Sequence, residues 1–443
     1  MQKSFRSFSM GVLNLLANAG VFIPYFFCLM LYNIHKTEPI FVLPFLMLYT
    51  FRCIGMLLTA QIKRSAIKMM NVSSIFGVLG SISMLFADNI FFGILGGILL
   101  GLASSWLWPY FLTIRSRGKL SNEFSMTKQS WLYSLIAMIL LLVVSFVAMK
   151  YKEMAIAFIL LAILFLFAWF GGVFLKNEID FYHEDDFKAS FIHPSRLILN
   201  LVYLTILVVL VFSIRYSRLK TTSHSLDLIM CILAAVILGT LIYVQLGIHK
   251  KIFPLSLGAL NRGFVMNFLL LYSTFDSTLR FNFEATVWIF VIYLLGFEIG
   301  PMLLKNFPQY RYPILFVGML LTLFNFVPIY FLGLFLAAVF VGADNTLLNR
   351  SLYNSPNLDG ERAFLVKYQL SSIGNISQQL IYMSLVYLLS YFLNLNVLSF
   401  FNPTVHGATY TTLTAVHTVI TLGILLISLI TYHFVKKLPL TDE

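Results

Sequence analysis

The sequence predicts an all-α membrane protein that crosses the bilayer about fourteen times, as the length of its apolar runs indicates. Of its 443 residues, 59% are hydrophobic and only 11% are charged, and the mean hydropathy is +0.88. Charged residues make up about a quarter of an ordinary soluble domain. This composition therefore excludes a soluble, disordered or nucleic-acid-binding protein.

Each expected span is an apolar run bounded by polar or basic residues. The first six runs are 10–33, 39–61, 69–87, 91–113, 129–149 and 153–175. A polar stretch over 176–196 and two further runs, 197–215 and 226–247, come next. The last six runs are 257–275, 285–304, 312–329, 331–350, 366–394 and 411–435. We therefore expect an N-terminal bundle over 1–175, a central loop with two inserted helices over 176–256, and a C-terminal bundle over 257–443.

Basic residues predict the orientation, because short cytoplasmic loops of membrane proteins are rich in Lys and Arg. If the N-terminus is cytoplasmic, most of the 30 lysines and arginines fall in cytoplasmic loops, and Arg52 is the only one within a span. One loop does not follow this rule, because it is expected outside and yet contains Arg215, Arg218 and Lys220. We expect a multi-pass protein of the cell membrane with both termini in the cytoplasm. This bias explains the net charge of +12 without a nucleic-acid partner.

The last six runs repeat the first six. The sequence Gly11–Asn14 in the first run recurs as Gly258–Asn261, and Tyr25 recurs as Tyr272 at the same spacing. Similar matches continue in order along the following runs, with a slowly drifting offset. Ordered matches rarely arise by chance, and many transporters are built from such repeats.

This order of six, two and six spans resembles the fourteen-span members of the major facilitator superfamily. Gly55, Leu57, Lys63 and Arg64 match the loop that follows the second span in that family, although Thr59 replaces its aspartate. The antiporter signature of the fifth span is absent. The resemblance implies two pseudo-symmetric six-helix bundles that move a small molecule by alternating access, without enzymatic activity.

Ionisable residues within apolar runs are candidates for proton coupling or gating, because a charge in hydrocarbon costs a few kcal/mol. Arg52 lies in the second run, Glu298 is close to its repeat equivalent, and Asp344 lies in the twelfth run. A buried carboxyl group could bind and release a proton. An ion pair that joins or gates helices is the alternative. For His417, which also lies within a span, the sequence favours a hydrogen-bonded structural role.

By the resemblance, the first, fourth, seventh and tenth bundle helices line a substrate cavity. The candidate lining residues are Asn14, Asn18, Tyr25, Ser104, Ser105, Trp108, Asn261, Asn267, Tyr272 and Asn345. For any one asparagine, a hydrogen bond between helices is the alternative. The set indicates a mostly uncharged, aromatic-rich cavity for an amphipathic or lipophilic substrate, and it favours export.

We therefore expect a monomeric secondary carrier whose partners are its substrate, protons and the lipid bilayer. The sequence has no P-loop and no cluster of cysteine and histidine, so it indicates neither ATP hydrolysis nor a metal or other cofactor. A passive lipid or glycolipid flippase on the same fold is the first alternative. A polytopic transferase is less favoured, because the predicted outside loop 395–410 has no acidic residue.

Overall fold

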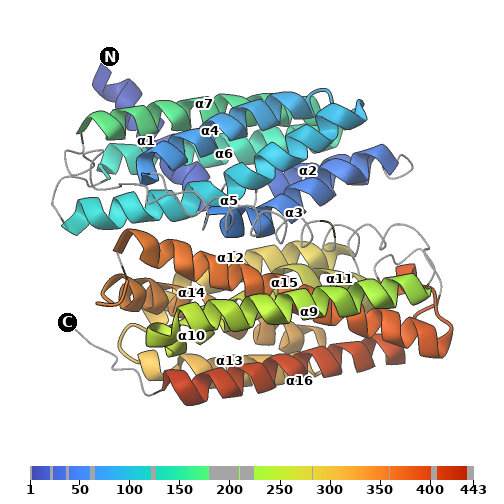
Figure 1. Ribbon diagram of the computed structural model, residues 1–443. Coiled ribbons are helices and arrows are strands. Elements are labelled where there is room, and N and C mark those ends of the chain that lie inside the picture. The colour runs from blue at the N-terminus through green and yellow to red at the C-terminus, as the bar shows by residue number, and fades with distance from the viewer. Residues whose placement is uncertain are drawn as a thin grey trace, which may run out of the picture. The chain divides into compact units, whose positions relative to one another are not determined.

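A computed structural model describes most of the 443 residues. The described ranges are 2–19, 23–35, 39–59, 65–120, 126–178, 209, 224–281, 283–358, 360–400 and 407–436. Their secondary structure is helical (Figure 1). The chain divides into two compact units, Met1–Val208 and Val209–Glu443. The predicted span 197–215, apart from Val209, and the loop with Arg215, Arg218 and Lys220 lie outside the described residues.

Unit 1 is a helical bundle. Its described helices are α1 (Gln2–Ala19), α2 (Ile23–Ile34), α3 (Val42–Thr59), α4 (Ala66–Met84), α5 (Ile90–Leu120), α6 (Lys128–Tyr151) and α7 (Met154–Glu178). Small residues allow α3 and α5 to pack closely: a Cβ atom added at Gly97 would lie 2.4 Å from the Pro44 carbonyl oxygen, and one at Gly101 would lie 2.6 Å from that of Leu48. Larger side chains at these glycines would push the two helices apart.

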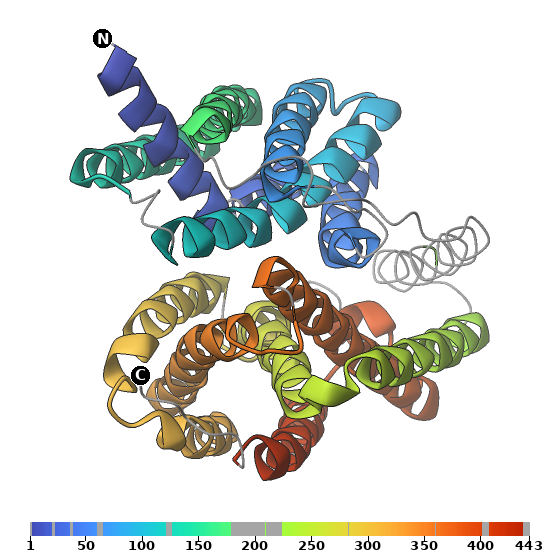
Figure 2. The ribbon, with the colours of Figure 1, turned by 60° about the vertical axis from the view of Figure 1, so that its left-hand side comes forward.

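Unit 2 is also a helical bundle (Figure 2). Its described helices are α9 (His224–Ile248), α10 (Phe253–Asn267), α11 (Ser273–Arg280), α12 (Phe283–Leu303), α13 (Arg311–Thr322), α14 (Val327–Tyr353), α15 (Gly360–Leu393) and α16 (Tyr410–Val435). A five-residue π-helical turn, η4 (Phe268–Tyr272), joins α10 to α11 without a break. The helix α9, which corresponds to the second inserted run, packs against α15.

The same helix pairs are in contact in both units, as the sequence repeat predicts. In unit 1, α5 packs against α3 and α4, and α1 packs against α6 and α7. In unit 2, α14 packs against α12 and α13, and α10 packs against α15 and α16. Since these helices occur in the same order along the chain, the described helices of the two units share one arrangement.

The described residues contain 9 helices that are long and apolar enough to cross a membrane. This agrees with a multi-pass membrane protein but does not reach the predicted fourteen spans. One reason is α13, whose 12 residues cover about 18 Å, short of the hydrocarbon thickness. The boundary between the runs 312–329 and 331–350 was predicted near Pro328 and Gly333. In the structure it lies earlier in the chain, since α13 ends at Thr322 and α14 begins at Val327. Pro328 lies in the first turn of α14, where proline needs no backbone N–H.

Candidate functional site

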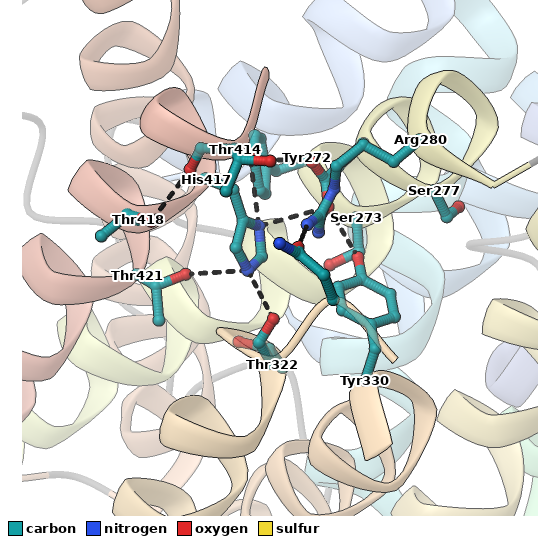
Figure 3. A network of polar contacts seen from close by, with 12 residues as sticks. Tyr272, Ser273, Ser277, Arg280, Thr322, Tyr330, Thr414, His417, Thr418 and Thr421 are labelled. Carbon is teal, nitrogen blue, oxygen red and sulfur yellow. Dashed lines mark hydrogen bonds and ion pairs between the residues drawn. The ribbon is translucent and has the colours of Figure 1, made fainter. Parts of the chain in front are cut away.

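Four side chains of unit 2 surround the buried carboxylate of Asp276, and the five residues together are called the His417 network here. The four are Tyr272, Arg280, Tyr330 and His417 (Figure 3). One oxygen of Asp276, Oδ2, pairs with Arg280 Nη2 and accepts a hydrogen bond of 2.9 Å from the Tyr330 hydroxyl. His417 Nδ1 lies 3.2 Å from the same oxygen. The other oxygen, Oδ1, accepts a hydrogen bond of 3.2 Å from the Tyr272 hydroxyl.

Helix spacing brings the network together. Tyr272, Asp276 and Arg280 follow one another at intervals of four, which places them on one helical face. Tyr330 reaches this face from α14 and His417 from α16. All five side chains are buried. A buried carboxylate and guanidinium require each other as partners, so the network joins three helices of unit 2 by charge as well as by packing.

A second group of buried charges, which we call the Lys367 cluster, consists of Arg262, Arg311, Asp344 and Lys367. Arg311 Nε donates to Asp344 Oδ1 over 3.0 Å, and both side chains are buried. Arg262 interacts electrostatically with Asp344 and with Lys367. The cluster therefore holds three basic side chains and one carboxylate.

Neutral oxygen atoms hold the ammonium group of Lys367. Its Nζ atom donates to Asn345 Oδ1 and, over 2.5 Å, to Asn349 Oδ1. The residue is completely buried, with 0% of its surface exposed. Arg262 Nη1 makes a weak contact of 3.4 Å with the Ser371 hydroxyl. The positive charges of Lys367 and Arg262 thus depend on polar but uncharged neighbours and on the single carboxylate of Asp344.

The two groups lie at different levels of unit 2. Tyr330 and Asp344 are both in α14, where a rise of about 1.5 Å per residue separates them by about 21 Å. In the predicted orientation, the His417 network is in the extracellular half and the Lys367 cluster in the cytoplasmic half.

The structure brings three predicted site residues of unit 2 into these groups. Tyr272 belongs to the His417 network, Asp344 to the Lys367 cluster, and Asn345 binds Lys367. Glu298 is exposed on α12 and is part of neither group. The other two predicted lining residues hydrogen-bond to neighbouring helices.

These two residues are asparagines of α10. Asn261 Oδ1 accepts from the Ser428 hydroxyl over 2.9 Å, and Asn267 Nδ2 donates to Gln378 Oε1. Both are buried. Their amides therefore connect α10 to α16 and to α15, which is the alternative that the sequence left open for a single asparagine.

In unit 1 the predicted residues are partly engaged within the bundle. Asn18 Nδ2 donates to the Asn14 carbonyl and side-chain oxygens over 2.7 and 3.1 Å, and Asn14 Nδ2 contacts the Ser134 hydroxyl at 3.4 Å. The Ser105 hydroxyl donates to the Leu102 carbonyl over 2.9 Å. These contacts fix side chains on α1, α5 and α6.

The remaining candidates of unit 1 differ in burial. Ser104 is buried, whereas Trp108 and Arg52 are half-buried. Tyr25 is half-buried and packs against two aromatic rings of α3, those of Phe45 and Tyr49, with centroids 5.2 and 5.7 Å away. Its neighbourhood is aromatic, as the sequence predicts.

Sequence reasoning missed most of the buried charges of unit 2. The prediction that Arg52 is the only basic residue within a span was wrong, because Arg262, Arg280 and Lys367 are buried within helices. The count of basic residues assigned each of them to a neighbouring loop, because each lies close to or just beyond the end of a predicted apolar run. The spacing of four between Asp276 and Arg280 was the signal that would have revealed an intramembrane ion pair.

Within the part of the chain that the structure describes, no group of three His, Cys, Asp or Glu side chains could hold a metal ion. The arrangement can instead bind, hold or exchange protons and stabilise ionic contacts between helices, since its components are acids, bases and hydroxyl groups.

Solved structures similar in fold to this chain include transporters. A peptide transporter, POT, in complex with sulfate is similar over 98% of this chain and 94% of its own, with a TM-score of 0.58 and 12% identity. A POT family transporter in complex with 5-aminolevulinic acid is similar over 98% of this chain and 96% of its own, with a TM-score of 0.56 and 14% identity. The chain has the major facilitator fold.

At these identities the likeness concerns the fold, and it confirms an all-helical major facilitator fold but not the predicted number of fourteen spans. No protein-family model and no curated protein sequence matches the chain. The major facilitator fold of the neighbours agrees with the expectation of a protein that is not an enzyme.

Proposed function

We propose that this chain is a secondary carrier that moves a small molecule across the membrane by alternating access of its two units. The observation that carries the proposal is the major facilitator fold, which is shared over 98% of the chain with a peptide transporter. Carriers of this fold expose a central site to one side of the membrane and then to the other. The buried charges of unit 2 support the proposal, because such groups inside a membrane mark ion or substrate pathways.

Proton coupling is the second part of the proposal. Asp344 and Glu298 are the candidate acids, and Arg52, whose guanidinium stays protonated, is the candidate for coupling or gating through an ion pair. The pairing of Asp344 with Arg311 links α13 to α14, so a proton on Asp344 would weaken this link. Glu298 has an exposed side chain on α12, where a proton could reach it without unfolding the bundle.

The proposed substrate is an amphipathic or lipophilic molecule, and the proposed direction is export. The aromatic group of Tyr25, Phe45 and Tyr49 in unit 1 supports an apolar part of the substrate. The asparagines of α1, α10 and α14 supply hydrogen-bonding groups for its polar part. The lining residues that the sequence predicts in each unit are the proposed binding groups for the substrate.

The proposal is tested in inverted membrane vesicles with a panel of amphipathic fluorescent compounds. Wild type is compared with Glu298→Gln and Asp344→Asn, each at equal amounts of folded protein. Glu153→Gln is the matched control, because Glu153 is an exposed acid between α6 and α7. We expect uptake that needs a proton gradient, that stops when an uncoupler is added, and that is lost in at least one of the two test variants but not in the control.

Movement that needs no gradient and is equal in all variants would replace the proton-coupled carrier with a passive flippase. Gradient-driven movement that persists in both variants would keep the carrier and remove Glu298 and Asp344 as coupling residues. If no compound moves while the vesicles hold their gradient, the proposed substrate class is wrong.

A further inference from the structure

Both ring nitrogens of His417 have defined partners, although the residue is 1% exposed. Nε2 lies 2.9 Å from the carbonyl oxygen of Thr322. This carbonyl belongs to the last residue of α13, so it has no hydrogen-bond donor within its own helix. Because a carbonyl oxygen only accepts, Nε2 must carry a hydrogen atom. The protonation of the ring is therefore decided at Nδ1.

The position of Nδ1 accommodates two protonation states. It lies 3.2 Å from Asp276 Oδ2 and 3.2 Å from the Tyr272 hydroxyl oxygen (Figure 3). With a proton, Nδ1 donates to the carboxylate and the ring is an imidazolium cation. Without one, the Nδ1 lone pair needs a donor, and the Tyr272 hydroxyl supplies it.

The Tyr272 hydroxyl can serve both states, because it is equally close to both acceptors. Its oxygen lies 3.2 Å from His417 Nδ1 and 3.2 Å from Asp276 Oδ1. When His417 is neutral, the hydroxyl hydrogen points to Nδ1. When His417 is protonated, the same hydrogen turns to Asp276. A single rotation thus keeps the ring and the hydroxyl hydrogen-bonded before and after a proton binds, which removes the main cost of moving a proton in a buried site.

The neighbouring ionisable groups keep their own protonation states, so the exchangeable proton of the network is the one on His417. Asp276 keeps Arg280 and the Tyr330 hydroxyl as partners in both states. The groups that face His417 from the neighbouring elements are Asp276 and Arg280 of α11, Tyr272 of η4, Tyr330 of α14 and, through the ring of Tyr272, Tyr382 of α15. Arginine and tyrosine hold their protons well above neutral pH, so the imidazole is the group here whose ordinary pKa lies in the physiological range.

The network also contacts one residue at the surface and includes the last residue of the π-helical turn. Arg280 Nη1 donates over 3.0 Å to Asn325 Oδ1, and Asn325 is exposed in the turn between α13 and α14. Tyr272 is the last residue of the π-helical turn η4, and such turns occur often at functional sites. A proton at His417 therefore changes contacts between the predicted cavity helix, α10 to α11, and α16.

We propose that His417, together with Asp276 and Tyr272, is the proton-binding site of this carrier. Protonation replaces the Tyr272–His417 hydrogen bond by an ion pair between α16 and α11. In the predicted orientation the site takes up protons from the extracellular side. This inference rests on the proposed function for its role in transport, but the binding of the proton is a property of unit 2 that does not depend on any substrate.

The first test measures protonation directly. The full chain with 15N-labelled histidine is placed in lipid nanodiscs, and the ring nitrogens are followed by NMR from about pH 5 to about pH 9, the range around the ordinary pKa of imidazole. His417→Gln assigns the signal. As the pH rises across this range, we expect His417 to change from an imidazolium to a neutral ring with hydrogen on Nε2. His433, which is exposed on the same helix, supplies an internal reference.

Two variants give the titration opposite shifts. Tyr272→Phe removes the donor to Nδ1 of neutral His417, and in the protonated state it leaves the Asp276 carboxylate with one donor fewer, which strengthens its pairing with the imidazolium. Both effects favour the protonated ring, so the titration midpoint should rise. Asp276→Asn removes the carboxylate, so the midpoint should fall. The His433 midpoint should stay constant. A His417 ring that keeps one protonation state across the whole range, or a midpoint that neither variant moves, would overturn the proposed site.

The second test separates this inference from the proposed function. In vesicles, His417→Gln should abolish uphill transport driven by a proton gradient but keep exchange of labelled for unlabelled compound, which needs no net proton movement. His433→Gln is the control and should transport as wild type does. A wild type that transports nothing would refute the proposed function while the titration still decides the proton site. Normal proton-driven transport in His417→Gln would refute the proton site alone.

Discussion

The His417 network and the Lys367 cluster stabilise buried charges of unit 2 with different sets of partners. In the His417 network, one carboxylate faces one guanidinium, and tyrosine hydroxyls complete the contacts of Asp276. In the Lys367 cluster, one carboxylate faces three basic groups. Among the described residues, each group has one arginine Nε without a hydrogen-bond partner, that of Arg280 or of Arg262, but only the Lys367 cluster also has a carboxylate oxygen without one, Asp344 Oδ2. The first group is close to neutral, whereas the second carries excess positive charge.

The difference in partners and net charge determines how each group can respond when a proton binds or leaves. The His417 network can take up a proton because a hydroxyl group turns from one acceptor to another. The Lys367 cluster has no such donor at its carboxylate, so every change of its charge alters the balance among three buried cations. We therefore expect the first group to act in proton exchange and the second to depend strictly on Asp344 for stability.

The largest expected effect is that of Asp344→Asn on stability. The substitution leaves Arg262, Arg311 and Lys367 buried without a carboxylate, and breaking a buried ion pair in this way costs about 3–5 kcal/mol. The thermal unfolding of the purified chain in detergent should shift to clearly lower temperature. In the double variant with Arg311→Gln, part of this loss should be recovered. Glu298→Gln, in an exposed position, is the matched control, and equal melting of Asp344→Asn and wild type would show that the cluster does not need its acid.

The next effect concerns the packing of α10 against α15, which places Arg262 in the cluster. A Cβ atom at Gly263 would lie 2.0 Å from the Ser371 carbonyl oxygen, so Gly263→Ala must separate the two helices. We expect a loss of about 1–3 kcal/mol, as for other overpacked sites. The control is Gly423→Ala in α16, where a Cβ atom would meet nothing within 4 Å. Urea or thermal unfolding measures both, and equal stability of the two variants would contradict the close contact.

The next prediction compares the stability cost of removing a tyrosine hydroxyl in each group: Tyr330 in the His417 network and Tyr312 beside the Lys367 cluster. The Tyr330 hydroxyl donates to Asp276 over 2.9 Å. The Tyr312 hydroxyl, which is buried near Asp344, has no partner of ordinary hydrogen-bond distance and angle among the described residues and makes only a weaker contact with Asn261. Tyr330→Phe should cost about 1.5–3 kcal/mol, the usual value for a hydrogen bond to a charged group. Tyr312→Phe should change stability by less than about 0.5 kcal/mol, since no hydrogen bond of ordinary geometry is lost. Melting curves that rank these variants in the reverse order would refute the contrast between the two groups.

The sequence predicted the fold better than the site, for a physical reason. Apolar runs long enough to span a bilayer must form helices, because lipid offers no other partner for the backbone. The run 257–275, for example, became α10, η4 and the start of α11. The repeat of Gly11–Asn14 as Gly258–Asn261 likewise predicted that α10 occupies in unit 2 the place of α1 in unit 1.

The site depends on partners that lie far apart in the chain. Asp344 was recognisable as a charge within an apolar run, but nothing in its local sequence identifies Arg311 or Lys367 as its neighbours. Asp276 was missed because it follows the apolar run by one position and reads as a loop residue. His417 received a structural role because a single histidine in a helix reveals neither Asp276 nor Tyr272, which only the packing of α16 against α11 brings to it.

The smallest expected effect is a pH dependence that belongs to neither group. His249 lies between α9 and α10, outside the spanning segments, and burial lowers its pKa below the usual value. In the unfolded chain His249 gains a proton more readily than in the folded chain. Its contribution to stability is therefore present at neutral pH and is lost as the pH falls through the unfolded pKa of about 6.5. His249→Gln should make the melting temperature fall less between about pH 7.5 and about pH 5.5, which brackets that pKa. Any pH dependence of the melting temperature that remains in His249→Gln and disappears in His417→Gln then belongs to the His417 network. If the melting temperature of His249→Gln falls with pH as steeply as that of wild type, the burial of His249 has no energetic consequence.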